Sequence, residues 1–414
     1  MPGRGTAALL VVLLLPTAGA CAPPAEAPEP VTLRVLMTDD WAATPTVLDA
    51  VRDFEAARAG VRVHVEGVPV REMMPLVKAE ISAGTPPDVA QGHAFAAAAQ
   101  GIAQPLDDLW GGRLDPGEYL PGAVEDVTWA GRRYGVPLDT NAMVLLYNKE
   151  HFAGTAAAPP TEWSTFGDMQ RAAAAVTAPD GSRRALAFPF NTWQVYGWIR
   201  ANGGEVVEVA GDGQVRVTLD APAVVEAVGF LAGLVREGHA FASLRSDVFT
   251  DADALFRSGS ASVLPSGSWA FPALEAAGAD RYGSALLPRG TTGATRGSAL
   301  GGSSLFVPQG SNHRDLAFAF MLHLTSDRYA LRAAREEGRL PARPRVLRDP
   351  YFEGPGLRVV LDQLQVAAPF KLVALPEVSS LFSEAVDDAL RGRKEAGDAL
   401  RDAQRRAERA LEAR

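Results

Sequence analysis

Residues 134–152, YGVPLDTNAMVLLYNKEHF, constrain the fold of this chain more than any other stretch. Residues 134–137 predict a short strand that stops at proline, residues 138–141 a polar crossing segment, and residues 143–147 an apolar second strand. Two strands that flank a polar bend fit a connection between two α/β lobes, and ligands tend to lie where such lobes meet. A buried strand and a surface loop inside one domain would also fit this stretch. The rest of the sequence is needed to distinguish these two interpretations.

The amino terminus has the pattern of a secretion signal. Residues 7–15 form an apolar run of nine residues, which is too short to span a bilayer but fits the core of a signal peptide. Small residues follow and lead into Cys21, the only cysteine of the chain, so an internal disulfide is impossible. This pattern resembles a bacterial lipoprotein signal, although Ala18 stands where leucine is usual. We expect residues 1–20 to be a signal peptide and Cys21 to be lipidated; the alternative is an ordinary cleaved signal that leaves an idle thiol.

A segment rich in proline, alanine and glutamate, residues 21–31, follows the signal. Such a composition cannot build a core and predicts an extended tether. One acyl anchor and a tether would hold an exported protein on the outer face of the cytoplasmic membrane, either extracellular or periplasmic. No later apolar run reaches the roughly 18–20 residues that a membrane helix needs.

Charge and length narrow the class of protein further. Without residues 1–20 the chain loses only Arg4 from its 40 Lys and Arg, which leaves 39 against 49 Asp and Glu, a net charge of −10. That sign argues against nucleic acid and against anionic lipid headgroups as partners. The roughly 390 residues that remain are more than one core usually supports, so two domains are expected.

The region after the tether alternates between predicted strands and helices. Strands are predicted at residues 32–37 and 61–66, helices at residues 46–59 and 71–82, and a third strand begins within residues 84–90. Such alternation with short loops is the signature of a doubly wound α/β sheet. In these sheets, ligands lie beyond the carboxyl ends of the strands.

By that rule, the residues directly after the first and third strands are candidates for ligand contact. Asp39, Asp40 and Trp41 follow the first strand, and residues 91–93 follow the third, of which we select Gln91. A helix cap is the alternative role for Asp40, because aspartate is a preferred residue at helix starts.

The second half of the chain supplies further candidates. Residues 186–190 predict a strand, and Trp193 comes soon after it. Trp193 and Trp198 are five residues apart and cannot share one narrow helix face, so Trp193 is the better cleft candidate. Residues 381–414 predict two helices, divided at Gly392 and docked on one lobe.

The sequence contains none of the common catalytic motifs. The six histidines have no H-x-x-x-H or HExxH spacing, and no G-x-S-x-G elbow, GxxxxGK[ST] loop or G-x-G-x-x-G turn is present. We therefore expect no metal, no cofactor and no enzymatic activity. A pair of carboxylates from two loops, as in a glycosidase, is the one catalytic arrangement that the sequence leaves open.

A series of short motifs, each weak by itself, occurs in a characteristic order over nearly the whole chain from residue 33. The motifs lie at residues 84–89, 101–107, 134–152, 256–269, 287–288, 301–303 and 312–320. This ordered series resembles the extracellular solute-binding proteins of ABC sugar importers, the maltose-binding-like family.

The resemblance implies a two-lobe α/β fold of the periplasmic-binding-protein type. Each lobe would be a doubly wound sheet flanked by helices, and a hinge of several crossings would join the lobes. We expect one lobe to comprise residues 32–139 and 303–337, and the other residues 140–302 and 338–414. The family also implies a monomer that captures a mono-, di- or short oligosaccharide between its lobes and delivers it to an ABC permease.

Sugar binding would need aromatic planes for the C–H faces of the rings and polar groups for the hydroxyls. Trp41, Trp193 and Trp269 are candidate planes, and the glycines would allow close backbone approach. The candidate ligand contacts are Asp39, Asp40, Trp41, Gln91, Asp139, Asn141, Trp193, Gln194, Trp269, Gly301, Gly302, Ser303 and Arg343. For Arg343, which the family resemblance suggests, the alternative is a surface arginine on a proline-rich loop, and for the glycines it is a flexible turn.

Two other classes of solute are alternative ligands to a sugar. An acidic cleft without aromatic residues would suit a polyamine, and a cluster of arginines or helix amino termini would suit an anion. Tryptophans near the strand ends favour sugar over both.

Overall fold

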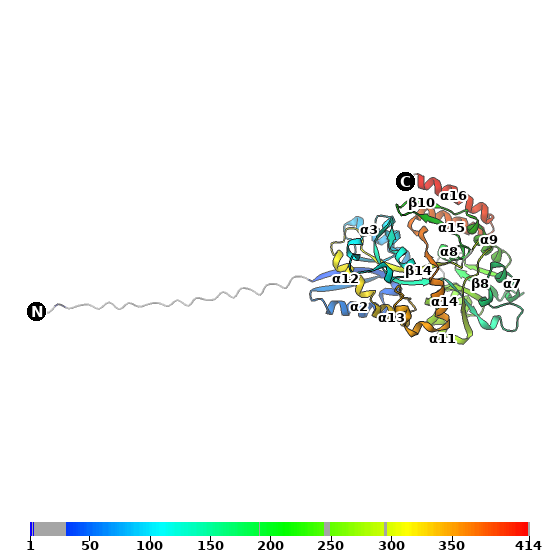
Figure 1. Ribbon diagram of the computed structural model, residues 1–414, viewed down its shortest axis with the longest axis horizontal. Helices are drawn as coiled ribbons and strands as arrows, with labels where there is room; N and C mark the ends of the chain where they lie inside the picture. The colour runs from blue at the N-terminus through cyan, green and yellow to red at the C-terminus, as the bar shows by residue number, and fades with distance from the viewer. Residues whose placement is uncertain (2, 4–29, 190, 244–248, 294–295, 413–414) are drawn as a thin grey trace.

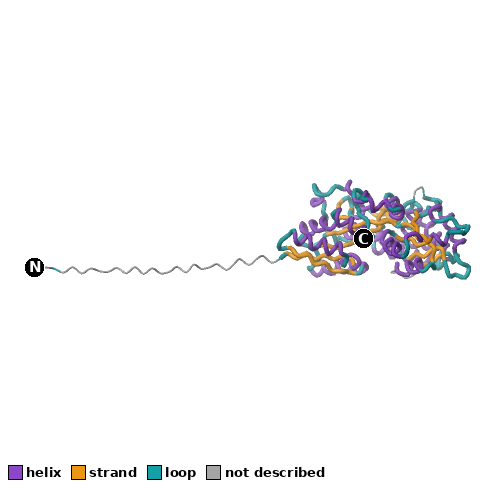
Figure 2. The backbone as a smooth tube through the Cα atoms, turned by 90° about the horizontal axis from the view of Figure 1, so that it is seen from below, coloured by secondary structure: helices purple, strands orange, loops and turns teal. Residues whose placement is uncertain are grey.

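The computed structural model describes residues 1, 3, 30–189, 191–243, 249–293 and 296–412. Residues 4–29, which include Cys21, lie outside the described residues, so the signal peptide, the lipidation and most of the tether stay predictions (Figure 1). Within the described part of the chain, no helix is both long and apolar enough to cross a membrane. Strands and surrounding helices occupy both halves of the folded body (Figure 2).

The first of two large sheets has the strand order β15-β14-β3-β1-β2, and β6 also pairs with β14. Its strands are β1 (Val31–Thr38), β2 (Val61–Val68), β3 (Val89–Gly92), β6 (Gly135–Ala142), β14 (Ser298–Phe306) and β15 (Ala367–Pro369). β1 is parallel to β2 and β3, whereas β14 is antiparallel to β3 and β6. The strand and helix alternation predicted for this region is therefore confirmed.

The helices on this sheet begin and end where local signals place them. They are α2 (Pro45–Ala56), α3 (Val70–Ala83), α12 (Arg314–Leu324) and α13 (Asp327–Glu337). The Thr44 hydroxyl accepts a hydrogen bond from the Val47 N–H and caps α2, and Gly84 ends α3 with φ +77°. α2 ends three residues before the predicted residue 59.

The second large sheet has the order β11-β8-β12-β7-β13. Its strands are β7 (Val144–Asn148), β8 (Arg184–Pro189), β11 (Ala240–Ser243), β12 (Ala261–Ser266) and β13 (Tyr282–Ala285). The main helices around it are α7 (Phe166–Val176), α8 (Thr192–Ala201), α9 (Pro222–Arg236) and α10 (Phe249–Arg257).

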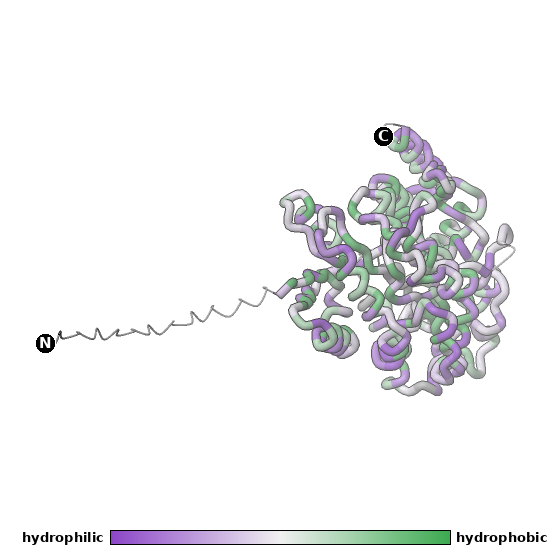
Figure 3. Tube along the Cα trace, turned by 60° about the vertical axis from the view of Figure 1, so that its left-hand side comes forward, coloured by the Kyte–Doolittle hydropathy of each residue, from purple (hydrophilic) through white to green (hydrophobic). Residues whose placement is uncertain are grey.

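The predicted pair of carboxy-terminal helices is present as α15 (Pro376–Leu390) and α16 (Ala396–Glu412). Gly392, with φ +66°, lies between them. Both pack on α9, and the outer turns of α16 near the carboxy terminus are largely hydrophilic (Figure 3).

The remaining described elements are short or connect the two sheets. They are α1 (Asp39–Ala42), α4 (Ala94–Ala99), α5 (Asp107–Trp110), α6 (Pro121–Asp126), α11 (Phe271–Ala276), α14 (Pro355–Leu364), β4 (Thr128–Trp129), β5 (Arg132–Arg133), β9 (Val207–Val209) and β10 (Val215–Val217). Of the short 3-10 turns, η4 (Ser268–Ala270) and η8 (Lys371–Ala374) matter for the site.

The two sheets are joined by segments that lie side by side. β6 of the first sheet passes into β7 of the second with only Met143 between them, and β14 returns to the first sheet. A third segment lies beside β6, where the Thr140 N–H donates to the Leu340 carbonyl at 2.8 Å. Residues 134–152 therefore cross between the sheets, whereas the lobe boundaries stay a prediction.

One local prediction in this stretch is wrong. Pro137 does not stop the strand, because β6 continues through it to Ala142. The register between β6 and β14 shifts at this point: Ser303 lies opposite Asp139, and Ser304 opposite Pro137. Such a bulge is one of the few places where a sheet accommodates proline, since the missing N–H need not join the ladder.

Candidate functional site

A cavity of about 310 Å³ lies where the first sheet faces residues that follow the second. Its volume is at the lower end of the range typical of small-molecule sites. It is lined by Thr38, Asp40, Trp41, Val70, Met73, Met74, Gln91, Gly92, His93, Ala96, Gln100, Asp139, Asn141, Trp269, Gly302, Ser303, Arg339 and Val373. Eight of the thirteen candidate residues are among these: Asp40, Trp41, Gln91, Asp139, Asn141, Trp269, Gly302 and Ser303.

The ends of neighbouring strands bring the polar residues of the cavity together. Asp40 lies just beyond the end of β1, and Gln91 lies in the last residues of β3. Because parallel strands end at the same edge of a sheet, both residues line one cavity although they are far apart in sequence. Asp40 lies in the first turn of α1 and not at its cap, which Thr38 occupies.

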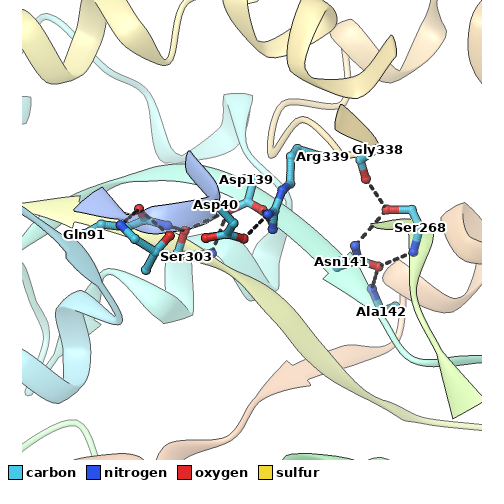
Figure 4. A network of polar contacts seen from close by, with 10 residues as sticks. Asp40, Gln91, Asp139, Asn141, Ala142, Ser268, Ser303, Gly338 and Arg339 are labelled. Atoms are coloured by element: carbon cyan, nitrogen blue, oxygen red, sulfur yellow. Dashed lines mark hydrogen bonds and ion pairs between the residues drawn. The ribbon is translucent and has the colours of Figure 1, made fainter. Parts of the chain in front are cut away.

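A continuous chain of hydrogen bonds crosses the strands at this edge (Figure 4). The Thr38 N–H and hydroxyl donate to Gln91 Oε1 at 2.9 and 3.1 Å. Gln91 Nε2 donates to Ser303 Oγ at 2.9 Å, and the Ser303 N–H and hydroxyl both donate to Asp139 Oδ1 at 2.8 Å. The chain thus fixes side chains from β1, β3, β14 and β6 relative to one another.

The bulge in β6 and a glycine in β14 allow this arrangement. Gly302 has φ +100°, and a Cβ atom there would lie 2.5 Å from the Asp139 carbonyl oxygen. Only glycine fits such a backbone at such close approach. Bulges commonly turn a side chain toward a site, and here the bulge accompanies the placement of Asp139 on the cavity.

Arg339 joins two carboxylates across the cavity and was not among the candidates. Its guanidinium donates to Asp40 Oδ2, and its Nη1 lies 4.0 Å from Asp139 Oδ2 (Figure 4). The same guanidinium lies over the Trp41 ring, 5.4 Å from the ring centre. It follows directly after Gly338, which ends α13 with φ +69°.

The two carboxylates beside Arg339 differ in their proton affinity. Burial raises the pKa of Asp139 above its usual range, and the charge of Arg339 and the hydrogen bonds from Ser303 offset this only in part. Partial burial also opposes ionisation of Asp40, but a hydrogen bond from Thr38 and the charge of Arg339 outweigh it and lower the pKa of Asp40. One guanidinium therefore holds one strongly ionised carboxylate and one whose charge is costly to bury.

A second, uncharged network lies beside the first. Asn141 Nδ2 donates to Ser268 Oγ at 2.7 Å, and Asn141 Oδ1 accepts from the Ser268 N–H at 3.1 Å and the Ala142 N–H at 2.9 Å. The Ser268 hydroxyl in turn donates to the Gly338 carbonyl at 2.7 Å (Figure 4). This network ties β6, η4 and the end of α13 together.

The three candidate tryptophans have different positions. Trp41 is 3% exposed and is covered by Arg339, so little of its ring remains for a ligand. Trp193 does not line the cavity: its Nε1 donates to the Leu300 carbonyl at 2.8 Å, and its ring packs against Gly301, where a Cβ atom would lie 3.1 Å away. Trp269 is partly buried, lines the cavity and packs against Trp193 with ring centres 5.9 Å apart.

Two further candidates lie away from the cavity for reasons of local geometry. Asp39 is exposed, on the side of α1 that faces Gly67. Gln194 is fully buried at the start of α8, where its Nε2 donates to the Pro265 carbonyl at 3.1 Å.

Arg343 also lies outside the cavity, and it is not at the surface. It is buried, with Nη2 donating to the Tyr119 hydroxyl at 2.6 Å and Nη1 donating to Asp327 Oδ1 at 3.1 Å. It therefore anchors the segment that carries Arg339. Among the described residues, no group of three or more acidic, cysteine or histidine side chains could hold a metal ion.

Comparison with known proteins identifies the family. The family model described as bacterial extracellular solute-binding protein matches residues 49–357, which is 309 of the 414 residues. The chain is 25% identical over 324 residues to the sn-glycerol-3-phosphate-binding periplasmic protein UgpB of Rhizobium meliloti, covering 73% of this chain and 74% of the relative.

Two solved structures show the same fold at low sequence identity. The GacH receptor of Streptomyces glaucescens superposes with a TM-score of 0.79 at 23% identity, over 92% of this chain and 99% of that one. UgpB of Mycobacterium tuberculosis, solved in complex with glycerophosphocholine, superposes with a TM-score of 0.78 at 21% identity, over 93% of this chain and 98% of that one.

These findings confirm the two-sheet α/β fold of the periplasmic-binding-protein type and the resemblance on which it was expected. They also agree with a receptor that binds a solute without transforming it. The chain belongs to the bacterial extracellular solute-binding protein family.

Proposed function

We propose that this protein binds an uncharged sugar, a mono-, di- or short oligosaccharide, in the cavity and delivers it to an ABC permease. The observation that carries the proposal is the Asp40–Arg339–Asp139 group beside Trp269. Carboxylates accept hydrogen bonds from sugar hydroxyls, a guanidinium donates to them, and such charge-assisted bonds are the stronger kind. Trp269 supplies an apolar surface for the C–H face of a ring.

The charge balance of the cavity favours a neutral ligand over an anion. Among the described residues that line the cavity, Arg339 is the one arginine or lysine, and it already faces two carboxylates. A phosphate monoester would have to compete with both carboxylates for the Arg339 guanidinium. We therefore consider sn-glycerol-3-phosphate, for which the Rhizobium meliloti relative is named, a weaker candidate ligand than a neutral sugar.

A zwitterionic phosphodiester is the second candidate. The cavity holds the Arg339 guanidinium, which would face the phosphate of such a ligand. It also holds two carboxylates and a tryptophan, which would face the ammonium group. The Mycobacterium tuberculosis structure contains glycerophosphocholine, which has this charge pattern, whereas the GacH receptor was solved with acarbose.

The two sides of the cavity suggest how binding would be signalled. Asp40 follows β1 and Gln91 lies in β3 of the first sheet, whereas Trp269 follows β12 of the second. A ligand that touches both sides favours the closed arrangement by its difference in affinity for the closed and open states. We propose that the crossing segments form the hinge, with lobes of residues 32–139 and 303–337, and of residues 140–302 and 338–414.

A thermal-shift screen of residues 22–414 tests the ligand class. A ligand at about a hundred times its dissociation constant adds roughly 2.7 kcal/mol of stability, which raises the melting temperature. We expect a rise with neutral sugars and none with sn-glycerol-3-phosphate or spermidine. Trp269→Ala and Asp139→Ala should abolish the rise, whereas Trp129→Ala, a change of another partly buried tryptophan outside the cavity, should not.

The outcome of this screen separates the candidates. A rise with glycerophosphocholine alone would replace the sugar by the phosphodiester. A rise that survives both cavity variants would contradict this cavity as the site, whatever the ligand.

Membrane attachment through Cys21 is a separate proposal that rests on the sequence. The full-length protein, expressed in a bacterium with labelled palmitate, should incorporate label and remain in the membrane fraction. Cys21→Ala should lose the label. A wild-type protein that is secreted without label would show an ordinary signal peptide instead.

A further inference from the structure

His93 is a cavity residue with one ring nitrogen already committed to the protein. Its Nδ1 lies 2.6 Å from Asp126 Oδ1, and the ring also contacts Phe95 with centres 5.7 Å apart. The imidazole lines the cavity and its side chain is 38% exposed. No hydrogen bond joins its Nε2 to any residue that the structure describes, so this nitrogen is left for the cavity.

Asp126 is built into the protein as a fixed partner for this ring. It is 6% exposed, and its Oδ2 lies 2.9 Å from the Ser304 hydroxyl. Ser304 Oγ is itself fully buried and accepts the Ala94 N–H at 2.9 Å. A buried carboxylate held in this way accepts a hydrogen bond from the Nδ1–H, which fixes the tautomer and the orientation of the ring.

We propose that His93 determines ligand specificity through Nε2, which accepts a hydrogen bond when the ring is neutral and donates one when it is protonated. Because Nδ1 carries its proton in both states, the change of protonation reverses the polarity of Nε2 toward the cavity. This inference rests on the proposed ligand site, to which it adds a contact, and Asp126 acts in it as a positioning residue.

The charged groups around the ring favour the protonated state. Burial opposes the charged imidazole, but the charge and hydrogen bond of Asp126, together with the charge of Asp139, outweigh burial and raise the pKa of His93. α4 packs against α6, β4, β14 and η8, which contribute Glu125 and Asp126 from α6 and Lys371 from η8. Lys371 Nζ pairs with Glu125 Oε2 at 3.3 Å, so these two charges largely offset each other.

A protonated ring makes the stronger hydrogen bond to an oxygen acceptor, whether a sugar hydroxyl or a phosphodiester oxygen. We therefore expect binding to be at least fivefold tighter at pH 5.5 than at pH 8.5. Calorimetry with glycerophosphocholine, and with the sugar that gives the largest thermal shift, measures this directly. His93→Gln should reduce the difference to less than twofold.

Two variants separate the cavity contact from general effects of histidine titration. Asp126→Asn removes the carboxylate charge, so it should keep the pH dependence of binding but move its midpoint to lower pH. His313→Gln is the matched control, because His313 Nδ1 also pairs with a buried aspartate, Asp88, at 3.1 Å, yet does not line the cavity. It should leave the wild-type profile unchanged.

A measurement without ligand keeps this inference distinct from the ligand class. A ¹H–¹⁵N titration of the histidine rings should show the His93 proton on Nδ1 and a midpoint that falls in Asp126→Asn. If His93 titrates in this way but every sugar fails to bind, the proposed sugar is wrong and glycerophosphocholine remains the probe. If His93→Gln keeps the wild-type pH dependence of binding, or if Nδ1 is unprotonated in the neutral ring, the inference is overturned.

Discussion

The two polar networks of Figure 4 lie side by side but differ in charge and in their exposure to the cavity. The first, Asp40, Arg339, Asp139, Ser303 and Gln91, is charged and lines the cavity. The second, Asn141, Ser268 and the Gly338 carbonyl, is uncharged, and Asn141 and Ser268 are at most 2% exposed. Only Asn141 of this second network reaches the cavity.

The two networks differ in which of their contacts a ligand can replace. Arg339 reaches Asp40 through its side chain alone, and Asp40 is 54% exposed, so a ligand hydroxyl could enter between them. In the second network, the Asn141 amide and the Ser268 hydroxyl have their partners inside the protein. We infer that the charged network sets affinity and the uncharged network sets how the crossing segments are held.

The largest expected effect on binding is that of Arg339→Ala. The change removes the donor to the ligand and leaves Asp40 and Asp139 without a counter-charge. A hydrogen bond from a charged group contributes roughly 1.5–3 kcal/mol, so we expect about a ten- to hundredfold loss of affinity by calorimetry.

Arg343→Ala is the matched control for this variant, since it removes an arginine four residues away. Arg343 bonds Tyr119 and Asp327 inside the protein, so its loss should lower the melting temperature and reduce affinity much less than Arg339→Ala does. If the two variants changed affinity equally, the comparison between cavity and scaffold would fail.

The uncharged network is tested by Ser268→Ala. The variant removes the hydroxyl between Asn141 Nδ2 and the Gly338 carbonyl, and leaves both groups buried without that partner. Buried groups left unsatisfied cost about 1–3 kcal/mol each, so for these two groups we expect a loss of about 2–6 kcal/mol in the free energy of unfolding. Scanning calorimetry would measure it, and Ser303→Ala, in the charged network, should reduce affinity more than stability.

Arg339 and Arg343 also show how far the sequence could predict the site. Strand ends could be predicted from the alternation of apolar and polar residues, and they placed Asp40 and Gln91 correctly at the edge of the sheet. No such rule distinguishes two arginines in one loop. Which one enters the cavity depends on the left-handed turn at Gly338 and on Tyr119 and Asp327, which capture Arg343 from distant parts of the chain.

Pro137 and Trp193 show the same limit at the level of the backbone. A proline usually stops a strand, and only the bulge opposite Ser303 and Ser304 lets β6 continue. Trp193 follows a strand as predicted, but its ring packs against Gly301, which has no side chain, and bonds the Leu300 carbonyl instead of lining the cavity. In both places a partner more than a hundred residues away decides the outcome, and the local sequence carries no signal of it.

A smaller effect distinguishes the two stacked tryptophans. Trp193→Phe removes the Nε1 bond to the Leu300 carbonyl while keeping an aromatic ring, which should cost about 1 kcal/mol of stability with affinity little changed. Trp269→Phe keeps a ring on the cavity and should change affinity more than melting temperature. Thermal denaturation and calorimetry on the pair would show whether the division between scaffold and cavity extends to the aromatic residues.

The smallest effect concerns the two carboxylates that share Arg339, which should respond to pH with opposite sign. The pKa of Asp139 is raised, chiefly by burial, so the folded protein binds its proton more tightly than the unfolded chain, whose pKa is near 3.8. The stability that Asp139 contributes is therefore highest at low pH and falls as the pH rises through the raised pKa.

The pKa of Asp40 is lowered despite its partial burial, by Thr38 and Arg339, so its contribution is present above pH 3.8 and is lost as the pH falls through the lowered pKa. Between pH 3 and 7, the stability of the wild type relative to Asp139→Asn should decrease with pH, and relative to Asp40→Asn it should increase. If stability changed with pH by the same slope in both comparisons, the two carboxylates would not differ in their interaction with the Arg339 guanidinium. The inference that a ligand replaces one of these contacts more easily than the other would then be contradicted.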